Sequence, residues 1–247
     1  MANVLEVTNI KKHFGGIAAV DGVSFSVRQG EILGIIGPNG CGKSTLFNCI
    51  LGQLEPTEGS VTLEGRDVTG LRPSDLNRLG VSRTFQLLQV FPQLTVHENL
   101  ILAGQEHQGS MLSRLFGARD AGLSDAATRM INLFKLQHRA EHKAGSLSYG
   151  QQKLLDAAMA FMAGPRLVLL DEPAGGVNLT MLGDLKERLR AMNQELGSTF
   201  VVIEHNMDFV MSLCTRVIVL AEGKMLAEGS PADVRANPKV IEAYLGH

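Results

Sequence analysis

The segment that most constrains the fold of this chain is a glycine-rich turn that ends in lysine, serine and threonine. It reads GPNGCGKST over residues 37–45, between a predicted buried strand at 32–36 and a predicted helix at 43–51. Glycines at these positions let backbone N–H groups surround phosphate oxygens, and the N-terminus of the following helix adds its positive end. The motif in this context predicts an α/β fold that binds the phosphates of a nucleotide.

Two side chains of this loop carry specific chemistry. Lys43 supplies a point charge for the outer phosphates, and the hydroxyl of Ser44 is a suitable ligand for Mg²⁺. The alternative is a glycine-rich turn that only connects a strand to a helix, but the motif and its context together favour the phosphate site. The residues expected to contact the nucleotide are Gly37, Pro38, Asn39, Gly40, Cys41, Gly42, Lys43, Ser44 and Thr45.

Two acids follow a second buried run, LVLL at 167–170. Ligands of parallel sheets bind at the carboxyl ends of the strands, so Asp171 and Glu172 are expected to face the phosphate loop. Asp171 would hold Mg²⁺, usually through water, and Glu172 would polarise the water that attacks the γ-phosphate. The alternative is that these acids cap the next helix. His205 follows another buried strand, 200–203, and this position makes it a candidate γ-phosphate contact, although a lone histidine there is more often structural.

A second segment also suits an anion, at the start of the predicted helix 148–163. Ser148 is a natural N-cap, and Gly150 leaves the first turn without a side chain. On this fragment alone, ordinary helix capping is the better interpretation. The order of features along the chain changes that balance, because Gln86 and this segment fall between the phosphate loop and the two acids.

In this order the motifs resemble those of the ATP-binding cassette (ABC) family, over essentially the whole chain. Residues 37–44 resemble its Walker A loop, Gln86 its Q-loop and residues 147–151 its signature. Residues 167–172 resemble Walker B, residues 174–178 the D-loop, His205 the switch histidine, and Phe14 the aromatic residue under the adenine.

The resemblance implies a P-loop NTPase cassette in one domain, 1–247, with a RecA-like parallel-sheet core, an antiparallel β subdomain and a helical subdomain that carries the signature. The core and β subdomain would take roughly 1–85 and 164–247, and the helical subdomain 86–163. The implied catalytic residues are Glu172, His205, Lys43 and Gln86, and the implied Mg²⁺ ligands are Ser44, Gln86 and Asp171.

In that family two cassettes face head to tail, and each ATP lies between the phosphate loop of one chain and the signature of the other. The resemblance therefore implies that Ser148, Gly150 and Gln151 contact the ATP bound by a second cassette, identical or related. Two residues depart from the commonest pattern. Tyr149 replaces the first glycine of LSGGQ, and Asn178 replaces the final aspartate of the D-loop, a lost charge that bears on communication between the two sites.

Several segments resemble the cassettes of branched-chain amino acid importers, among them KHFGG at 12–16, LSYGQQ at 147–152 and NPKVIEAYLG at 237–246. Cassettes for urea, amide or aromatic acid import, and for lipopolysaccharide export, are similar at this level. The resemblance implies two transmembrane permease subunits, an extracytoplasmic solute-binding protein as an indirect partner, and a place at the cytoplasmic face of the membrane. Near the Q-loop, the apolar residues either line a docking groove for the permeases or fill the local core; they are Phe85, Leu87, Leu88, Phe91 and Leu94.

Composition bounds the remaining alternatives. The net charge of −2 gives no general basic field for nucleic acid. The three cysteines show no pairing pattern, which is typical of a reducing compartment. No apolar run reaches the roughly 20 residues of a membrane-spanning helix. A soluble ABC protein of translation or DNA repair usually has two cassettes or a long coiled coil, and a nucleotide kinase lacks the signature segment.

The rest of the chain predicts alternating strands and helices. Strands are expected within the first thirty residues and at 60–63, and a hairpin at 216–221 and 224–227. Helices are expected at 126–138, 181–196, 207–212 and 231–245, and a surface insertion at 104–125.

Overall fold

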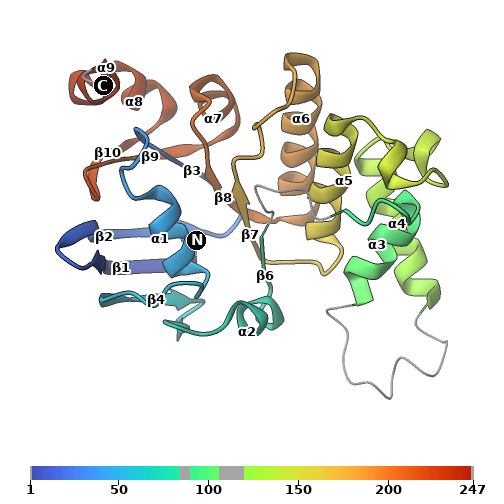
Figure 1. The fold of residues 1–247 in the computed structure, drawn as a ribbon, viewed down its shortest axis with the longest axis horizontal. Helices are drawn as coiled ribbons and strands as arrows, with labels where there is room; N and C mark the ends of the chain where they lie inside the picture. Colours follow the sequence, from blue (N-terminus) through green and yellow to red (C-terminus); the bar gives the residue numbers. More distant parts are fainter. Residues whose placement is uncertain (1, 84–89, 106–119, 246–247) are drawn as a thin grey trace.

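A computed structural model describes residues 2–83, 90–105 and 120–245 of the chain (Figure 1). Within these residues the strands form two sheets. The smaller, antiparallel sheet has the order β2-β1-β4-β5, with β1 at Asn3–Phe14, β2 at Ile17–Arg28, β4 at Glu58–Leu63 and β5 at Arg66–Asp67. It corresponds to the antiparallel β subdomain expected from the apolar–polar alternation of the first thirty residues.

The larger sheet has the order β10-β9-β3-β8-β7-β6 and is parallel except for its edge strand β10. Its strands are β3 at Ile32–Ile36, β6 at Val81–Arg83, β7 at Leu167–Asp171, β8 at Thr199–Ile203, β9 at Arg216–Ala221 and β10 at Lys224–Gly229. The three central strands β3, β8 and β7 are neighbours, so the segments that follow them meet at one edge of the sheet.

Side-chain alternation along the central strands divides the interior into two cores. Leu33 and Ile35 of β3 face one core, which they share with the antiparallel sheet and with α1 at Lys43–Ile50. Ile32 and Ile36 point to the opposite core, which the later helices cover. All five residues of β3 are buried, as expected for a parallel strand covered on both faces.

The later helices lie on the second core and beyond the sheet. In Figure 1, α3, α4 and α5 gather at the end of the molecule away from the antiparallel sheet, while α8 and α9 lie near β9 and β10. The helices other than α1 are α2 at Pro73–Arg78, α3 at Val96–Gln105, α4 at Asp120–Leu133, α5 at Tyr149–Phe161, α6 at Leu179–Leu196, α7 at Met207–Leu213, α8 at Pro231–Ala236 and α9 at Pro238–Leu245, with short 3-10 turns at Gln137–Arg139 and Ala144–Ser146.

The fold class predicted from the sequence is confirmed, including the strand at 32–36 and the helices that begin near residues 43, 148 and 207. The proposed boundaries at 85/86 and 163/164 stay a prediction. None of the described helices has the length and apolarity that crossing a membrane would require. The elements α2, β6 and α3 were not predicted, because they are short or only weakly periodic in sequence.

Three predicted segments need correction. The insertion at 104–125 is helical at both ends, because Gly104 of α3 lets Leu123 of α4 approach so closely that a Cβ at Gly104 would lie 2.7 Å from the Leu123 Cδ2. The helix predicted at 126–138 ends at Leu133, since Lys135 has a φ of 53°. The helix predicted at 231–245 is two helices, because Asn237 precedes Pro238 and has extended backbone.

Candidate nucleotide-binding site

The phosphate loop, residues 37–42, connects β3 to α1. Two of its glycines are required by close backbone contacts as well as by their positive φ angles. A Cβ at Gly37 would lie 2.2 Å from the Leu220 carbonyl oxygen, and one at Gly42 would lie 2.2 Å from the Ala19 carbonyl oxygen. Any other residue at these positions would force the loop away from β9 and β2, so the glycines set its path.

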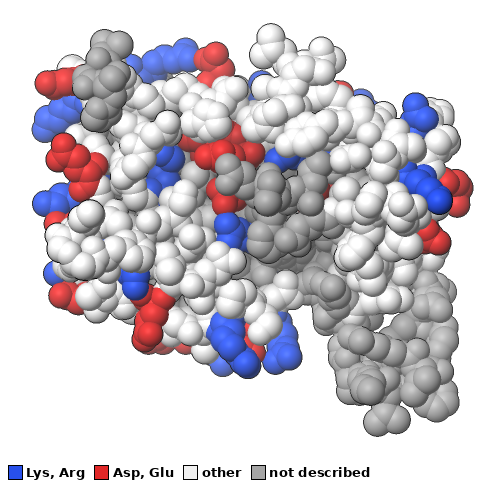
Figure 2. Space-filling view, viewed as in Figure 1, with Lys and Arg blue, Asp and Glu red and all other residues white. Residues whose placement is uncertain are grey.

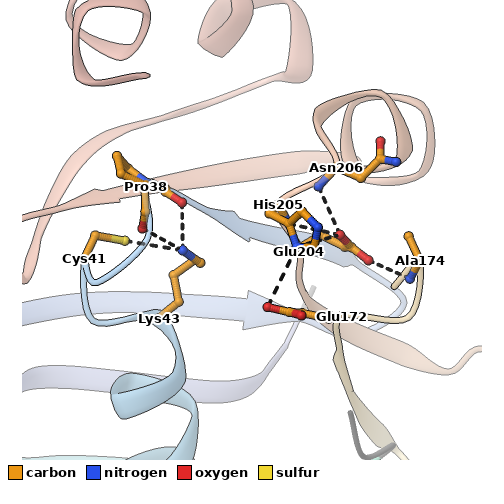
Figure 3. Close-up of polar contacts among 9 residues, drawn as sticks. Pro38, Cys41, Lys43, Glu172, Ala174, Glu204, His205 and Asn206 are labelled. Atoms are coloured by element: carbon orange, nitrogen blue, oxygen red, sulfur yellow. Dashed lines mark hydrogen bonds and ion pairs between the residues drawn. The ribbon is translucent and has the colours of Figure 1, made fainter. Parts of the chain in front are cut away.

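Lys43 is the first residue of α1, and its ammonium is held inside the loop. The Nζ donates to the carbonyl oxygens of Gly37 at 2.7 Å and Pro38 at 2.9 Å, and it lies 3.7 Å from the Cys41 Sγ (Figure 3). The residue is only 8% exposed. The lysine therefore occupies the centre of the loop, where it compensates carbonyl dipoles, while Ser44, Asn39 and Gly40 are exposed and Thr45 is half-buried.

Asp171, at the end of β7, is bound by an arginine that the sequence analysis did not single out. Arg83, the last residue of β6, donates from Nη2 to the Asp171 Oδ2 at 2.7 Å and from Nη1 to the Gln53 side chain at 2.6 Å. Both members of the ion pair are largely buried, with side-chain exposures of 14% and 12%. Arg83 begins the segment RTFQ, one of those that resemble the importer cassettes, but its contact with the acid was not predicted, because it depends on the pairing of β6 with β7.

Glu172 and His205 come from the neighbouring strands β7 and β8. The backbone N–H of Glu172 donates to the Ile203 carbonyl at 2.9 Å, and its Oε1 lies 3.8 Å from the His205 Nδ1. Glu172 has a φ of 47°, a left-handed conformation uncommon for a residue with a side chain. In Figure 3 these two side chains lie across from Lys43, so a phosphate held by the loop would have the acid and the histidine on its far side.

The donors present suit a magnesium ion that arrives with a nucleotide. Among the described residues, no three His, Cys, Asp or Glu side chains gather to hold a metal by themselves. Proteins usually bind Mg²⁺ through one or two carboxylates together with substrate phosphates and water. The Asp171 carboxylate and the exposed Ser44 hydroxyl are hard oxygen donors of that kind. Gln86, the third expected ligand, lies outside the described residues.

The signature segment forms a capping box at the start of α5. The Ser148 hydroxyl accepts from the Gln151 N–H at 3.3 Å, and the Gln151 side chain accepts from the Ser148 N–H at 3.0 Å. The capping interpretation is therefore confirmed, and contact with an anion stays a prediction for Ser148, Gly150 and Gln151. In Figure 1, the start of α5 lies well apart from α1, so one chain does not bring its own signature to its own loop.

The two unusual signature and D-loop residues have structural roles. Tyr149 is 48% exposed and lies over Gly176, where an added Cβ would be 2.9 Å from its ring. Asn178 caps α6, because its side chain accepts from the Met181 N–H at 3.0 Å. Asparagine thus keeps the capping function of an aspartate at this position without its charge.

Phe14, at the end of β1, is the aromatic residue expected under the adenine, and Tyr244 of α9 lies beside the loop. Phe14 ends β1, is 48% exposed, and lies 5.4 Å from the Lys12 Nζ. Tyr244, on α9, was not singled out by the sequence analysis. Its phenol is a neighbour of Cys41 in the loop, and burial, with a further contribution from Cys41, raises the pKa of Tyr244 to about 12. An exposed aromatic ring at Phe14 is available for stacking on a base.

A groove of about 430 Å³ separates α2 and β6 from α3 and α5. Phe91 is 46% exposed and lines this groove, so it does not fill the local core. Leu94 is half-buried and lies outside the lining, whereas Phe85, Leu87 and Leu88 fall outside the described residues. Asn99 is fully buried and bonds the backbone of Phe91 in both directions, which makes this wall of the groove rigid.

Charges of both signs are interspersed on the face drawn in Figure 2, and acidic side chains gather near its centre. No broad basic surface covers the described residues of that face. The mixed charges on this face agree with the net charge of −2.

Comparison with known proteins gives matches over the whole chain. The family described as "ABC transporter" matches residues 20–175, and the one described as "Branched-chain amino acid ATP-binding cassette transporter" matches residues 224–247. The chain is 38% identical to the high-affinity branched-chain amino acid transport ATP-binding protein BraF of Pseudomonas aeruginosa, over 98% of each chain. It is 37% identical to the corresponding protein LivG of Escherichia coli K12, again over 98% of each.

Solved structures show the same fold. An ATP-binding cassette of an ABC transporter in its ADP conformation superposes with a TM-score of 0.89, at 36% identity, over 100% of both chains. A bacterial ABC transporter cassette described as dimeric superposes with a TM-score of 0.77, at 28% identity, over 92% of this chain and 98% of that one.

Proposed function

This chain belongs to the ATP-binding cassettes of ABC transporters, in the branched-chain amino acid family, and from this premise we propose that it hydrolyses ATP to drive the import of branched-chain amino acids. The observation that carries the proposal is the meeting of three groups at one edge of the parallel sheet. The phosphate loop follows β3, Asp171 and Glu172 follow β7, and His205 follows β8.

Binding of ATP would begin with an exchange of partners at Lys43. Its ammonium bonds the carbonyls of Gly37 and Pro38, and phosphate oxygens carry more negative charge than these carbonyls. The loop N–H groups and the start of α1 then surround the phosphates, while Phe14 stacks on the base. Ser44 and Asp171, with Gln86, would hold Mg²⁺, which when bound neutralises charge on the phosphate oxygens.

Hydrolysis would use the acid and the histidine on the far side of the γ-phosphate. Glu172 polarises the attacking water, and His205, 3.8 Å from that carboxylate, contacts the γ-phosphate. The left-handed backbone of Glu172 supports this role, since such conformations gather at active sites where they direct a side chain.

A complete site would need a second cassette. The chain carries a phosphate loop and a signature that lie apart, and a related cassette is described as a dimer. Two chains placed head to tail bring Ser148, Gly150 and Gln151 of each to the ATP of the other. The partner is this chain or a related cassette, ATP closes the pair, and hydrolysis reopens it.

The remaining partners follow from the family and from the groove beside Phe91. The exposed apolar side chain of Phe91 and the rigid wall of the groove suit a short helix from each of two transmembrane permease subunits. This would place the cassette at the cytoplasmic face of the membrane, with an extracytoplasmic solute-binding protein as an indirect partner. The permeases and that protein would select the amino acid.

Phosphate release by the purified chain tests the enzymatic part of the proposal. Lys43→Ala should abolish ATP binding and turnover, because it removes the charge at the centre of the loop. Lys239→Ala, at an exposed position of α9, is the matched control and should retain both. Turnover that survives the loss of Lys43 would contradict the proposed site.

Transport is tested in the native cell. We expect the tagged chain to co-purify with two hydrophobic membrane subunits after gentle solubilisation, and its deletion to abolish leucine uptake. Normal leucine uptake with loss of urea, amide or aromatic acid uptake would move the chain to another solute. Recovery without any membrane subunit would contradict the transporter function.

A further inference from the structure

Glu204 lies between the end of β8 and His205, and it is the most deeply buried carboxylate near the site. It is 0% exposed, although the next side chain, His205, is 59% exposed. Within the described part of the chain, no lysine or arginine forms an ion pair with it. Its neighbour Cys214 is uncharged at neutral pH, because burial, with a further contribution from Glu204, raises the pKa of that thiol to about 12. The His205 Nδ1 lies 3.8 Å from the Glu204 Oε2. A buried carboxylate without a lysine or arginine partner must be compensated by hydrogen bonds.

Three backbone N–H groups supply that compensation. The Glu204 Oε1 accepts from Ala174 at 2.6 Å, and the Oε2 accepts from His205 at 2.9 Å and from Asn206 at 3.0 Å (Figure 3). Ala174 lies two residues after Glu172, and His205 is the next residue after Glu204. The two oxygens of one side chain therefore bond the segments that carry the two proposed groups of hydrolysis.

This arrangement determines how the two segments lie relative to each other. The strands β7 and β8 end at the Glu172 N–H bond to the Ile203 carbonyl, and among the described residues no further ladder bond joins the two segments beyond it. Across that gap the Glu204 carboxylate is a rigid link, since its burial leaves it no alternative rotamer in solvent. Glu172 and His205 extend from either side of the link, and their side chains approach to 3.8 Å.

We propose that Glu204 is a positioning residue for ATP hydrolysis, whose buried carboxylate holds the backbone after Glu172 against the turn of His205 so that both side chains meet the same γ-phosphate. The inference rests on the proposed roles of Glu172 and His205. It assigns to Glu204 a function in turnover and none in binding ATP, because its bonds reach neither the phosphate loop nor Lys43.

A carboxylate is the side chain that fits this position. Both of its oxygens accept, so it satisfies donors on both sides at once. In Glu204→Gln the amide nitrogen is a donor. It would face either the Ala174 N–H or the N–H groups of His205 and Asn206, and two donors cannot form a hydrogen bond with each other. Glu204→Asp keeps two accepting oxygens and the charge, but it is one methylene shorter and cannot reach Ala174 while it bonds the adjacent turn.

The test compares both variants with the wild type in ATP binding and in turnover. We expect kcat to fall about tenfold to 100-fold, the effect of misplacing a reacting group by about 1 Å. The Kd for ATP should stay within about twofold, since the phosphate loop is unchanged. If Glu204→Gln fails to fold, Glu204→Asp carries the test, because it retains the buried charge and its neighbouring bonds.

Two further variants separate positioning from a general structural effect. Thr199→Val, at the other end of β8, removes a buried side-chain bond to the Gly30 N–H and should leave kcat unchanged despite its cost in stability. In a His205→Ala background, Glu204→Gln should reduce kcat by a smaller factor than it does in the wild type, since one of the two groups that it positions is gone. If Glu204→Gln lowers kcat by the same factor in the His205→Ala background as in the wild type, the inference is overturned.

The outcomes distinguish this inference from the proposed function. Turnover that survives Glu172→Gln would contradict the role of Glu172 itself, whatever Glu204 does. If Glu172→Gln abolishes turnover but both folded Glu204 variants keep the wild-type kcat, Glu204 has no positioning role and the proposed function stands. A parallel loss of ATP affinity and kcat would also overturn the inference, because it would indicate a general loss of structure.

Discussion

Asp171 is paired with Arg83 at 2.7 Å, and this contact gives the expected magnesium ligand a fixed orientation. The acid was predictable from its place after a buried strand, whereas the arginine was not. Arg83 lies 88 positions away, and only the pairing of β6 with β7 brings the two together. The same holds for Tyr244 and for the bond between Glu204 and Ala174, which depend on packing between distant elements that no local pattern encodes.

Replacing Arg83 should lower stability more than replacing an exposed arginine. Arg83→Met leaves the largely buried Asp171 carboxylate without its guanidinium, and we expect the free energy of unfolding to fall by about 2 to 4 kcal/mol. Arg166→Met is the control, because its ion pair with Glu64 is exposed and should contribute less than about 1 kcal/mol. Urea unfolding measures both, and equal losses would show that the Asp171 pair is not buried in solution.

At the scale of elements, the helices predicted at 43–51, 148–163, 181–196 and 207–212 lie within two residues of α1, α5, α6 and α7 at both ends. Ser148 predicted the start of α5 through capping chemistry that is local in sequence, whereas the cap of α6 at Asn178 was not predicted. The ends of α4 and α8 depend on a left-handed residue and on a proline, and the start of α4 depends on contact with α3 at Gly104. Tertiary contacts of this kind override the weak periodicity of residues 120–125.

Asn178 tests whether the missing charge of the D-loop has a structural cost. Asn178→Asp retains an acceptor for the Met181 N–H, so we expect a change in unfolding free energy below about 0.5 kcal/mol, whereas Asn178→Ala should cost about 1 kcal/mol. Thermal and urea unfolding measure the two variants. A loss in Asn178→Asp as large as that in Asn178→Ala would contradict the capping role.

Two helical glycines form a matched pair. Replacing glycine by alanine in a helix interior usually stabilises by up to about 1 kcal/mol, and Gly183→Ala of α6 should do so because its Cβ meets no atom within 4 Å. Gly150→Ala of α5 should gain nothing, because its Cβ would lie 2.6 Å from the Met181 Cε. Urea unfolding decides, and an equal gain at both positions would show that α5 and α6 are not packed this closely.

At the scale of the whole molecule, the sheet order explains why motifs scattered over nearly 170 residues converge. The strands β3, β8 and β7 are adjacent although they are remote in sequence, and their carboxyl ends carry the phosphate loop, His205 and the two acids. Sequence order and family resemblance predicted this convergence. Contact between the phosphate loop of one chain and the signature segment of a second cassette stays a proposal, because one chain holds only half of each expected site.

The most direct test of that account is the oligomeric state of Glu172→Gln with saturating Mg²⁺ and ATP, measured by light scattering after size exclusion. Loss of the carboxylate should stop water attack while ATP binding persists, so the variant is expected to accumulate as a dimer with no turnover. The wild type, which hydrolyses its ATP, should return to a monomer, as should the double variant Lys43→Ala with Glu172→Gln. A Glu172→Gln protein that stays monomeric at saturating ATP and hydrolyses it at the wild-type rate would contradict the account.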